Sequence, residues 1–536
     1  MKHKLLHAII LICTYTGTFA QPVLVNQKAI GGTGPDILMS MSLTKDGGLI
    51  AGGKSYSNIS YEKTQNIRGG WDYWVVKMDK HGKIEWDKTI GGNNDDGIKA
   101  VIQTLDGGYA LIGESISNIS VEKSENCRGG FDYWLVKLDS HGNIQWDKTI
   151  GGSGTEYIDN IVQTSDSGYV LAGSSTSDIS GEKTENGRGN FDIWVVKLNK
   201  NGKKIWDKTI GGSDYDLGSG VSATRDGGVI IGGFSGSNKS GEKSENNRGA
   251  GSDYWIIKLG KKGNIEWDKT IGGSNDDYCH SVYETSDGGY ILGGSSNSNT
   301  SGEKTQNSLG NYDYWLVKIN KNGKKVWDKT LGSNGDDYFN TMIKTKEGGY
   351  FLGGGSNGFI SANKTEDPRG GFDYWVINTD FKGNYLWDKT IGGYNDEYIY
   401  GLGEPVKNKF LAGGFSYSPE GADKTEFSRG DADFWIVVLN YTNTLNNSNT
   451  ATEEPSIKNV NIPAKRFSVY PNPAKDKLNI KVNGKAIISL SDQSGKTILT
   501  KTINGNDVIN ISNLPSGSYY LKNITTGDAE TIIINR

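Results

Sequence analysis

Acidic side chains recur at one position of this sequence with a spacing of 60 or 61 residues, and they are the first candidates for chemistry. The seven acids are Asp36, Asp96, Glu156, Asp216, Asp277, Asp337 and Glu397. Carboxylate oxygens are preferred ligands of Ca²⁺, and carboxyl groups also act as general acids and bases. A ring of these groups would form a candidate binding face.

Basic residues accompany the acids in a long polar segment of the type Ser-Gly-Glu-Lys-Thr-Glu-Asn-x-Arg-Gly. The lysine is present in all seven repeats, as Lys63, Lys123, Lys183, Lys243, Lys304, Lys364 and Lys424. The arginine is present in six, as Arg68, Arg128, Arg188, Arg248, Arg369 and Arg429, and Leu309 stands in the seventh. If each repeat folds into four up-and-down strands, this segment and the acid lie at the same end of the strands.

These repeated charges have two interpretations. A feature present in every repeat usually serves the geometry of the repeat, so the acids and bases would pair with each other or cap backbone amides. The alternative is a ligand or Ca²⁺ site, for which Asp95 and Asp96, or Asp214 and Asp216, would supply oxygen atoms. Neither pair has the full ligand spacing of a calcium loop. The pattern favours the structural role and predicts no cofactor, with Ca²⁺ as the alternative.

One column of the repeat varies in every copy, as expected for a site that holds a single asymmetric ligand. Its residues are Met39, Lys99, Asp159, Ser219, His280, Asn340 and Tyr400. We expect them to line the mouth of a central channel. Lys99, Asp159, His280 and Tyr400, together with the seven acids, are therefore the candidate binding residues.

No catalytic set is evident in the sequence. His81 and His141 occupy the same turn in two repeats, where other repeats carry asparagine or lysine. His280 follows Cys279 directly on a predicted strand, so the two side chains point to opposite faces. The sequence also contains no zinc-ligand spacing and no phosphate-binding glycine loop. We therefore expect a protein that is not an enzyme.

Two tryptophan motifs define the elements that position these residues. Trp-Asp-Lys-Thr begins at Trp86, Trp146, Trp206, Trp267, Trp327 and Trp387, and Asp-x-Trp ends at Trp74, Trp134, Trp194, Trp255, Trp315, Trp375 and Trp435. Trp71 is the remaining one of the 14 tryptophans. Within one repeat the pattern predicts strands at 97–104, 108–115, 131–139 and 143–150, joined by Asp-Gly turns. Four short strands repeated in this way are typical of a β-propeller blade.

The two ends of the array complement each other. The third predicted strand of a repeat occurs seven times, but the Trp-Asp-Lys-Thr strand occurs only six times. The segment 28–32 matches 88–92, which ends the fourth strand of a complete repeat. An N-terminal strand that completes the last blade would remove two open sheet edges. The sequence therefore predicts an all-β fold with a closed, seven-bladed propeller at 21–440.

The composition sets further limits. The chain has 536 residues, with 76 Gly, 10 Pro and 10% aromatic residues, which excludes collagen-like and disordered classes. Residues 1–20 read as a signal peptide, and no later segment is apolar for long enough to cross a membrane. Loss of this segment changes the formal net charge from −4 to −6, which gives no attraction for nucleic acid. Cys127 and Cys279 occupy different repeat positions, so we expect no disulfide framework and a monomer.

The sequence changes character after residue 440. Residues 441–466 are rich in Asn, Thr and Ser and read as a flexible linker. The motifs that follow, in order, are Tyr470-Pro471-Asn472-Pro473, Gly495-Lys496, and Leu514-Pro515 with Gly517 and Tyr519. This region, 467–536, resembles the type A C-terminal sorting domain of the type IX secretion system. The resemblance implies a small antiparallel β-sandwich, handling by the type IX machinery, and a place outside the outer membrane of a Gram-negative bacterium.

These observations favour a secreted or cell-surface, non-catalytic binding protein whose ligand is a glycan, a protein or matrix material. One alternative is an extracellular carbohydrate-active enzyme, a glycosidase or lyase, because propellers can present paired carboxylates. Another alternative is a structural surface-coat protein.

Overall fold

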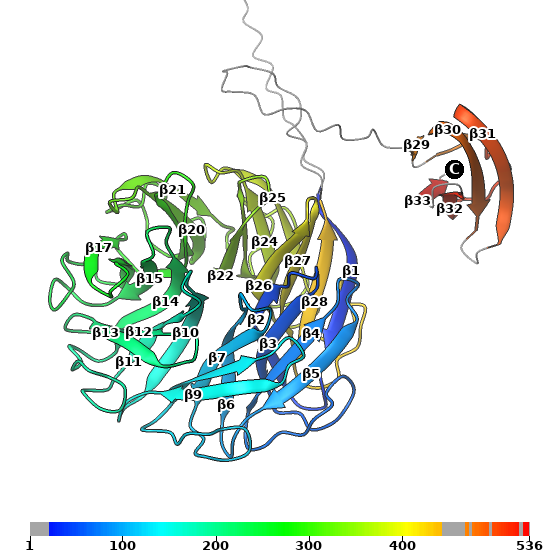
Figure 1. The fold of residues 1–536 in the computed structure, drawn as a ribbon. Helices are drawn as coiled ribbons and strands as arrows, with labels where there is room; N and C mark the ends of the chain where they lie inside the picture. Colours follow the sequence, from blue (N-terminus) through cyan, green and yellow to red (C-terminus); the bar gives the residue numbers. More distant parts are fainter. Residues whose placement is uncertain (1–20, 442–466, 471–473, 493–495, 525–528, 535–536) are drawn as a thin grey trace, which may run out of the picture. The chain divides into compact units, whose positions relative to one another are not determined.

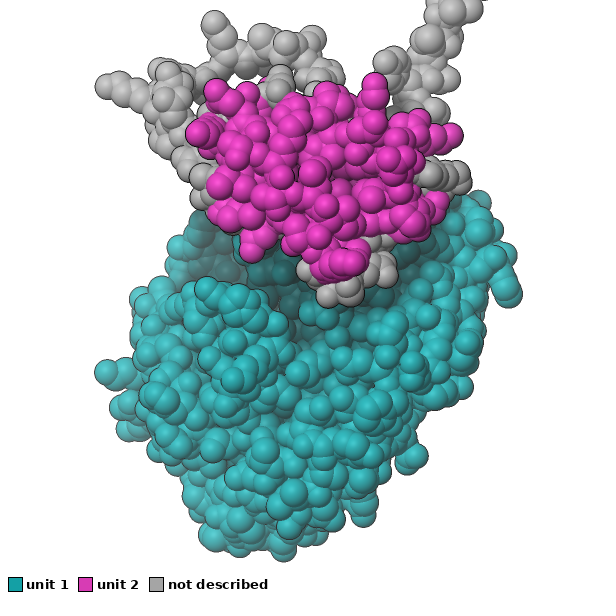
Figure 2. All heavy atoms as spheres, turned by 90° about the vertical axis from the view of Figure 1, so that its right-hand side faces the viewer, with its two compact units in different colours: residues 1–447 teal, residues 448–536 magenta. Residues whose placement is uncertain are grey.

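Every regular element among the described residues of the computed structural model is a β-strand, so the all-β prediction is confirmed. The structure describes residues 21–441, 467–470, 474–492, 496–524 and 529–534. The chain divides into two units, residues 1–447 and 448–536 (Figure 2). The predicted signal peptide, and the predicted linker apart from Tyr441, lie outside the described residues.

Seven four-stranded antiparallel sheets make up the described part of the first unit, and six of them use four consecutive strands (Figure 1). Sheet 1 contains β2 (Asp36–Leu43), β3 (Leu49–Ser55), β4 (Asp72–Met78) and β5 (Ile84–Ile90). Sheet 2 contains β6 (Asp96–Gln103), β7 (Tyr109–Ser115), β8 (Asp132–Leu138) and β9 (Ile144–Ile150). Sheet 3 contains β10 (Glu156–Gln163), β11 (Tyr169–Ser175), β12 (Asp192–Leu198) and β13 (Lys204–Ile210). Sheet 4 contains β14 (Asp216–Ala223), β15 (Val229–Ser235), β16 (Asp253–Leu259) and β17 (Ile265–Ile271). Sheet 5 contains β18 (Asp277–Glu284), β19 (Tyr290–Ser296), β20 (Asp313–Ile319) and β21 (Lys325–Leu331). Sheet 6 contains β22 (Asp337–Lys344), β23 (Tyr350–Ser356), β24 (Asp373–Thr379) and β25 (Tyr385–Ile391).

Sheet 7 joins the two ends of the array. It contains β26 (Glu397–Val406), β27 (Lys409–Ser416), β28 (Asp433–Asn440) and, as its fourth strand, β1 (Val23–Ile30). Ala29 pairs with Trp435 and Ile30 with Phe434, so the predicted pairing of the N-terminal strand is confirmed. The first strand of each sheet contacts the first strand of the next, and β2 contacts β26. The first strands therefore form a closed cycle.

Tight turns set the register within each sheet. Gly47 and Gly107, between the first and second strands of sheets 1 and 2, have φ values of 84° and 87°. Glycine adopts such angles without steric cost, which explains the Asp-Gly pattern. In the same turn Asp46 accepts hydrogen bonds from the backbone N–H of Gly48 and from the Thr44 hydroxyl. Asp46 also contacts the ammonium group of Lys77 at 2.8 Å.

The third-strand tryptophans are buried between adjacent sheets. Trp134, for example, is 0% exposed, and its ring lies 4.8 Å from that of Tyr73 on the preceding sheet. The Tyr73 hydroxyl donates to the backbone carbonyl of Trp134 at 2.8 Å. The indole N–H of Trp134 donates to Asp147 on the fourth strand of its own sheet at 2.9 Å. The Asp that recurs in each Trp-Asp-Lys-Thr motif thus accepts a hydrogen bond from a buried N–H, which would destabilise the fold if it had no partner.

The closing strand reproduces this bond with a different residue. Gln27 occupies the repeat position of Asp87, and its side-chain oxygen accepts the indole N–H of Trp435 at 3.1 Å. The same oxygen accepts the backbone N–H of Thr425 at 3.1 Å, as Asp87 accepts that of Thr64. The strand from the start of the array therefore completes the polar contacts of sheet 7 as well as its edge.

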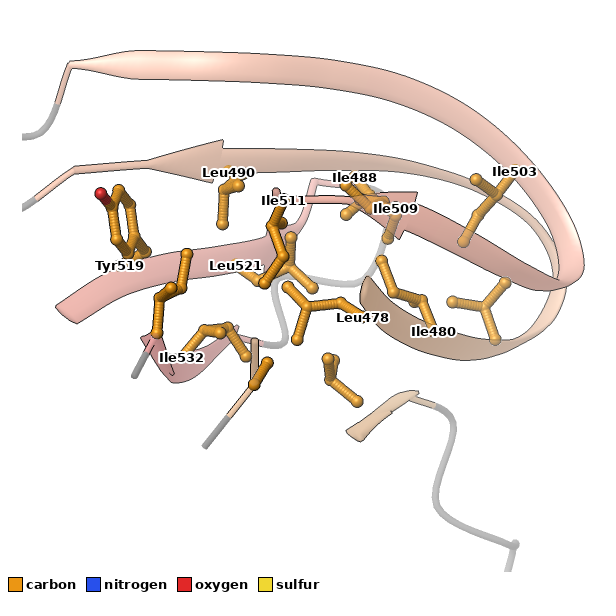
Figure 3. Close-up of a cluster of buried hydrophobic side chains, with 14 of the residues drawn as sticks. Leu478, Ile480, Ile488, Leu490, Ile503, Ile509, Ile511, Tyr519, Leu521 and Ile532 are labelled. Atoms are coloured by element: carbon orange, nitrogen blue, oxygen red, sulfur yellow. The ribbon is translucent and has the colours of Figure 1, made fainter. Parts of the chain in front are cut away.

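The second unit contains one five-stranded antiparallel sheet among its described residues. Its strands are β29 (Phe467–Tyr470), β30 (Lys477–Ser491), β31 (Thr497–Asn510), β32 (Gly517–Asn523) and β33 (Ala529–Ile534). The long β30 pairs with β31 along most of its length, and it also pairs with β29 at residues 479–482 and with β32 at residues 488–491. A register break between Lys481 and Lys485 accompanies the curl of the sheet around Leu478, Ile488 and Leu521 (Figure 3). The described strands of this unit thus form one curled sheet, and the β-sandwich that the resemblance implied is not confirmed.

Replacement of Gln27 should weaken closure of the first unit. Gln27→Ala leaves the buried indole N–H of Trp435 without its acceptor, and we expect a loss of about 1–3 kcal/mol in the free energy of unfolding. Gln27→Asp restores the residue type of the other six sheets and should recover most of this loss. The measurement is urea unfolding of the full chain, with Val25→Ala on the exposed face of β1 as the control. Equal stability of the Ala and Asp variants would contradict this role.

Candidate functional site: the central cavity

The first strand of every sheet in the first unit contains a β-bulge at the same position. In sheet 2, for example, the register between β6 and β7 shifts between Ile98 and Ala100, so Lys99 has no partner across the ladder. The seven bulged residues are Met39, Lys99, Asp159, Ser219, His280, Asn340 and Tyr400. These are the residues of the variable column. A bulge redirects a side chain out of the regular alternation of a strand.

All seven bulged side chains line a cavity of about 820 Å³ at the centre of the first unit. The variable column therefore lines one cavity. Lys344, Lys346 and Glu404 also line the cavity. The cavity wall thus differs from sheet to sheet, although the sheets themselves repeat.

Lys99 and Asp159, in the cavity wall on sheets 2 and 3, form a charge cluster with the neighbouring Glu114. The Lys99 ammonium is 3.6 Å from the carboxylate of Glu114, on β7. Burial raises the pKa of Asp159 to about 7, and the nearby charge of Lys99 opposes this shift. Burial also raises the pKa of Glu114, again opposed by Lys99. Burial lowers the pKa of Lys99, but the charges of Glu114 and Asp159 outweigh it and give a net increase.

The other predicted cavity residues are neutral. Burial lowers the pKa of His280 to about 4, so its imidazole is uncharged at neutral pH. Its ring lies parallel to that of Phe339, with 6.5 Å between centroids. Cys279 is buried in the hydrophobic core, on the opposite side of β18 from the cavity, as predicted. Burial raises the pKa of its thiol, which disfavours a reactive thiolate.

The seven recurring acids lie elsewhere, and here the expected binding face is wrong. Asp36, Asp96, Glu156, Asp216, Asp277, Asp337 and Glu397 are all at most 1% exposed. Asp36 accepts hydrogen bonds from the backbone N–H of Gly32 at 2.6 Å and from the Ser57 hydroxyl at 2.9 Å. The acids therefore cap the loop before each first strand. The spacing in the sequence shows that the acids recur, but only the folded structure shows that they are buried.

A second buried carboxylate faces each of these acids across the interface between sheets. Asp132 and Glu156 lie against the same glycine, since a Cβ on Gly151 would be 1.9 Å from one and 2.8 Å from the other. Burial raises the pKa of Asp132 to about 7, and the charge of Glu156 raises it further. Burial likewise raises the pKa of Asp72 to about 7, with Asp96 adding to the effect.

The loop arginines join adjacent sheets. Arg68 forms an ion pair at 2.8 Å with Glu122, which lies on the corresponding loop of sheet 2. Five further pairs follow the same pattern: Arg128–Glu182, Arg188–Glu242, Arg248–Glu303, Arg369–Asp423 and Arg429–Glu62. The last of these joins sheet 7 to sheet 1. Where Leu309 replaces the arginine, the facing position is Asn363 instead of an acid, so both partners change together.

The loop lysines are buried as well. Lys63 is 1% exposed, its ammonium donates to the Thr89 hydroxyl at 2.5 Å, and it lies 5.2 Å from the Trp74 ring centroid. Burial lowers the pKa of Lys63 to about 8. The repeated lysines and arginines therefore hold the loops in place, as the structural interpretation expected.

The described residues contain no group of three or more His, Cys, Asp or Glu side chains arranged to hold a metal ion. Asp96 and Asp216 are buried in the interfaces, and Asp95 accepts the backbone N–H of Trp71 at 2.9 Å. Asp214 accepts the backbone N–H of Tyr215 at 2.9 Å. Glu114 was not predicted. The sequence contains one clue to Glu114: its position on the second strand also varies between repeats, with Lys54 and Phe415 in other sheets.

Turn contacts explain the tail motifs that fall within the described residues. The Tyr519 hydroxyl donates to the backbone carbonyl of Pro515 at 2.9 Å, which links the two ends of the Leu-Pro-x-Gly-x-Tyr motif. The backbone N–H of Lys496 donates to Asp492 at 3.0 Å between β30 and β31. Pro471, Asn472, Pro473 and Gly495 lie outside the described residues.

Residues 468–535 match the family described as the secretion system C-terminal sorting domain. The chain therefore carries a type IX sorting domain after a β-propeller-like body, and it is a secreted or cell-surface protein. Among the described residues, no helix has the length and apolarity needed to cross a membrane.

Similarity elsewhere in the chain is low. The regulatory protein FlaEY of Caulobacter vibrioides is 22% identical over 244 residues, which cover 41% of this chain and 26% of FlaEY. The match thus spans about a quarter of that relative. A Dyadobacter fermentans protein of unknown function has a TM-score of 0.39 at 12% identity, covering 78% of this chain and 99% of that one. The Neurospora crassa Pan2 WD40 domain has a TM-score of 0.41 at 10% identity, covering 75% and 89%.

The missing ion pair between sheets 5 and 6 can be restored. Leu309→Arg together with Asn363→Glu should increase the free energy of unfolding by about 0.2–1 kcal/mol, as for partly exposed ion pairs. Each single variant should gain less than the pair. Urea unfolding of the four proteins of this double-mutant cycle gives the coupling energy. A coupling energy of zero would show that the arginine pairs do not stabilise the interfaces.

The facing carboxylates should make the first unit less stable as the pH rises. Burial raises the pKa of Asp36 to about 6 and those of Asp72, Asp253 and Asp373 to about 7. In an unfolded chain the pKa of Asp is about 4. The folded protein thus binds more protons at these groups, so their contribution to stability is fully present below about pH 4 and is lost as the pH rises through 6 to 7. The slope of unfolding free energy against pH increases with the number of carboxyl groups whose pKa is raised.

The urea midpoint of the full chain should therefore fall between about pH 4.5 and about pH 7.5. This window avoids the turn carboxylates such as Asp46, whose pKa is lowered to about 2. Asp72→Asn removes one titrating group at nearly constant shape and should reduce the slope. A midpoint that stays constant or rises over this range would contradict the assignment.

Proposed function

We propose that this chain is a non-catalytic binding protein, exported through type IX secretion, whose ligand enters the central cavity of a seven-bladed β-propeller. In this proposal 1–20 is a signal peptide, 21–440 the propeller, 441–466 a linker and 467–536 the domain handled by the secretion machinery. The protein acts as a monomer without a cofactor. Its ligand is an extracellular glycan, protein or matrix component.

The observation that carries this proposal is the contrast between the cavity wall and the rest of the first unit. Buried acids, lysines and tryptophans repeat from sheet to sheet because each serves the same structural contact. The seven bulged residues lie in the same geometry but share no side-chain type. Since a scaffold gains nothing from this variation, an asymmetric ligand is its simplest explanation. A rigid fold with variable, inward-facing positions is typical of binding proteins.

A carbohydrate-active enzyme is the second candidate, and one observation favours it. Glu114 and Asp159 both interact with Lys99, and burial raises the pKa of both carboxyl groups, that of Asp159 to about 7, while Lys54 acts in addition on Glu114. Glycosidases require two carboxyl groups whose environments separate their pKa values. Asp216, the other carboxylate considered from the sequence, is buried in an interface and does not line the cavity. A structural surface-coat role is the third candidate, but the variable cavity gives it no support.

The test is a glycan and protein array probed with the full secreted protein, followed by affinity measurement for each hit. Lys99→Ala and Asp159→Asn should each weaken binding by about tenfold or more, as for central binding residues. Ile205→Ala, at an exposed position of β13 outside both cavities, is the control and should bind as the parent does. All variants should keep the same thermal midpoint, because the altered side chains do not belong to the hydrophobic core.

Three results would overturn the proposal. No binding above background to any glycan or protein would leave the structural role. Equal affinity of all three variants would place the ligand outside the cavity. Turnover of a polysaccharide that is lost in Asp159→Asn would identify an enzyme instead.

A further inference from the structure

A second cavity of about 480 Å³ lies beside the first and shares Met39, Lys99 and Tyr400 with it. We call it the side pocket. Its wall comes from sheets 7, 1 and 2 and includes Trp71, the only tryptophan outside the two repeated motifs. The pocket lies at the end of the sheets that carries the long polar loops, since Pro35 and Asp431 also line it.

The side pocket exists because one position of the repeat lacks a side chain. The second residue of the first strand is Gly97 in sheet 2, and in the other sheets it is Ile37, Tyr157, Leu217, Tyr278, Tyr338 and Tyr398. Tyr157 and Tyr338 each lie between two of the aromatic residues that precede the third strands, and Tyr278 and Tyr398 each contact one of them, with ring centroids 5.4–6.0 Å apart. Gly97 presents no side chain at this position beside Trp71.

Nothing in the backbone requires a glycine at this position. Gly97 does not have a positive φ, and a Cβ there would lie 3.5 Å from the nearest atom of Lys54, an ordinary contact. A larger residue would therefore fit by filling the side pocket. The glycine is explained by the open space that it leaves.

The wall of the side pocket combines flat aromatic faces with balanced charges. Trp71, Tyr400 and Tyr417 supply the aromatic surface. Lys54, whose ammonium lies 4.6 Å from the Trp71 ring centroid, and Lys99 supply hydrogen-bond donors. Glu114 and Asp431 supply hydrogen-bond acceptors.

This combination selects one chemical class of ligand. Two ammonium groups and two carboxylates balance, so neither an anion nor a cation is favoured by net charge. A sugar hydroxyl both donates and accepts, and can therefore use an ammonium and a carboxylate at once. The C–H face of a pyranose ring is apolar and suits an aromatic surface, which otherwise costs free energy in water. A volume of about 480 Å³ is in the range of small-ligand pockets.

We propose that the side pocket around Gly97 and Trp71 binds one neutral pyranose unit of an extracellular glycan. The ring stacks on the aromatic wall, and its hydroxyls bond to Lys54, Lys99, Glu114 and Asp431. This inference rests on the proposed binding function and names its ligand class. The central cavity then accommodates the remainder of the glycan or the solvent that surrounds it.

The test fills the side pocket with the side chain that four other sheets carry. Gly97→Tyr should weaken binding of a neutral monosaccharide or oligosaccharide by about tenfold or more, and Trp71→Ala should do the same. Leu217→Tyr makes a tyrosine at the same position of sheet 4, away from the pocket, and should leave affinity unchanged. Affinities are measured by calorimetry with the full secreted protein, using glucose, galactose, mannose, N-acetylglucosamine and glucuronic acid and their short oligomers as probes.

The outcomes separate this inference from the proposed function. Unchanged glycan affinity in Gly97→Tyr, with loss in Lys99→Ala, would overturn the side pocket and retain binding in the central cavity. Binding of glucuronate but of no neutral sugar, or of proteins alone, would overturn the ligand class and retain a binding protein. No binding to any probe or array ligand would overturn both. Because Gly97→Tyr uses a residue native to this position in other sheets, its thermal midpoint should match that of Leu217→Tyr.

Discussion

The first unit depends on the burial of one tryptophan per sheet between two neighbouring sheets. Such a ring supplies a large apolar area, but its indole N–H must find an acceptor inside the protein. In six sheets the acceptor is the aspartate of the fourth strand. In the seventh sheet it is Gln27, which comes from the opposite end of the array. Closure of the ring is thus required both by the open sheet edges and by a buried polar atom.

Repetition of this contact commits most polar residues of the repeat to the scaffold. The acid before each first strand caps a loop, the lysine packs against a tryptophan ring, and the arginine reaches the next sheet. The interface between sheets 5 and 6 supports this view, because Leu309 and Asn363 replace an arginine and its partner together. Residues that recur in every sheet are therefore poor candidates for a ligand site, even when they are charged.

The exceptions to the repeat carry the functional argument. The bulges give every sheet one inward side chain that takes no part in the ladder, so it can vary without loss of pairing. Lys99 and Asp159 differ from their counterparts in charge, Gly97 differs in size, and Trp71 adds an aromatic face. These differences gather on sheets 1 to 3, and the two cavities meet at Met39, Lys99 and Tyr400 on sheets 1, 2 and 7. Sheets 1 to 3 therefore differ from the other sheets in the charge, size and aromatic character of these side chains.

The sequence alone determined the repeat length, the four-stranded sheets, the exchange of the N-terminal strand and the sorting domain, because each depends on local pattern and spacing. It also identified the variable column that lines the cavity. It did not determine that the seven acids are buried, since depth depends on loops from two sheets that pack together. Nor did it show that Lys99 lies beside Glu114, or that Gly97 leaves a pocket. Those facts arise where residues from different strands and sheets meet, and only the tertiary structure brings them together.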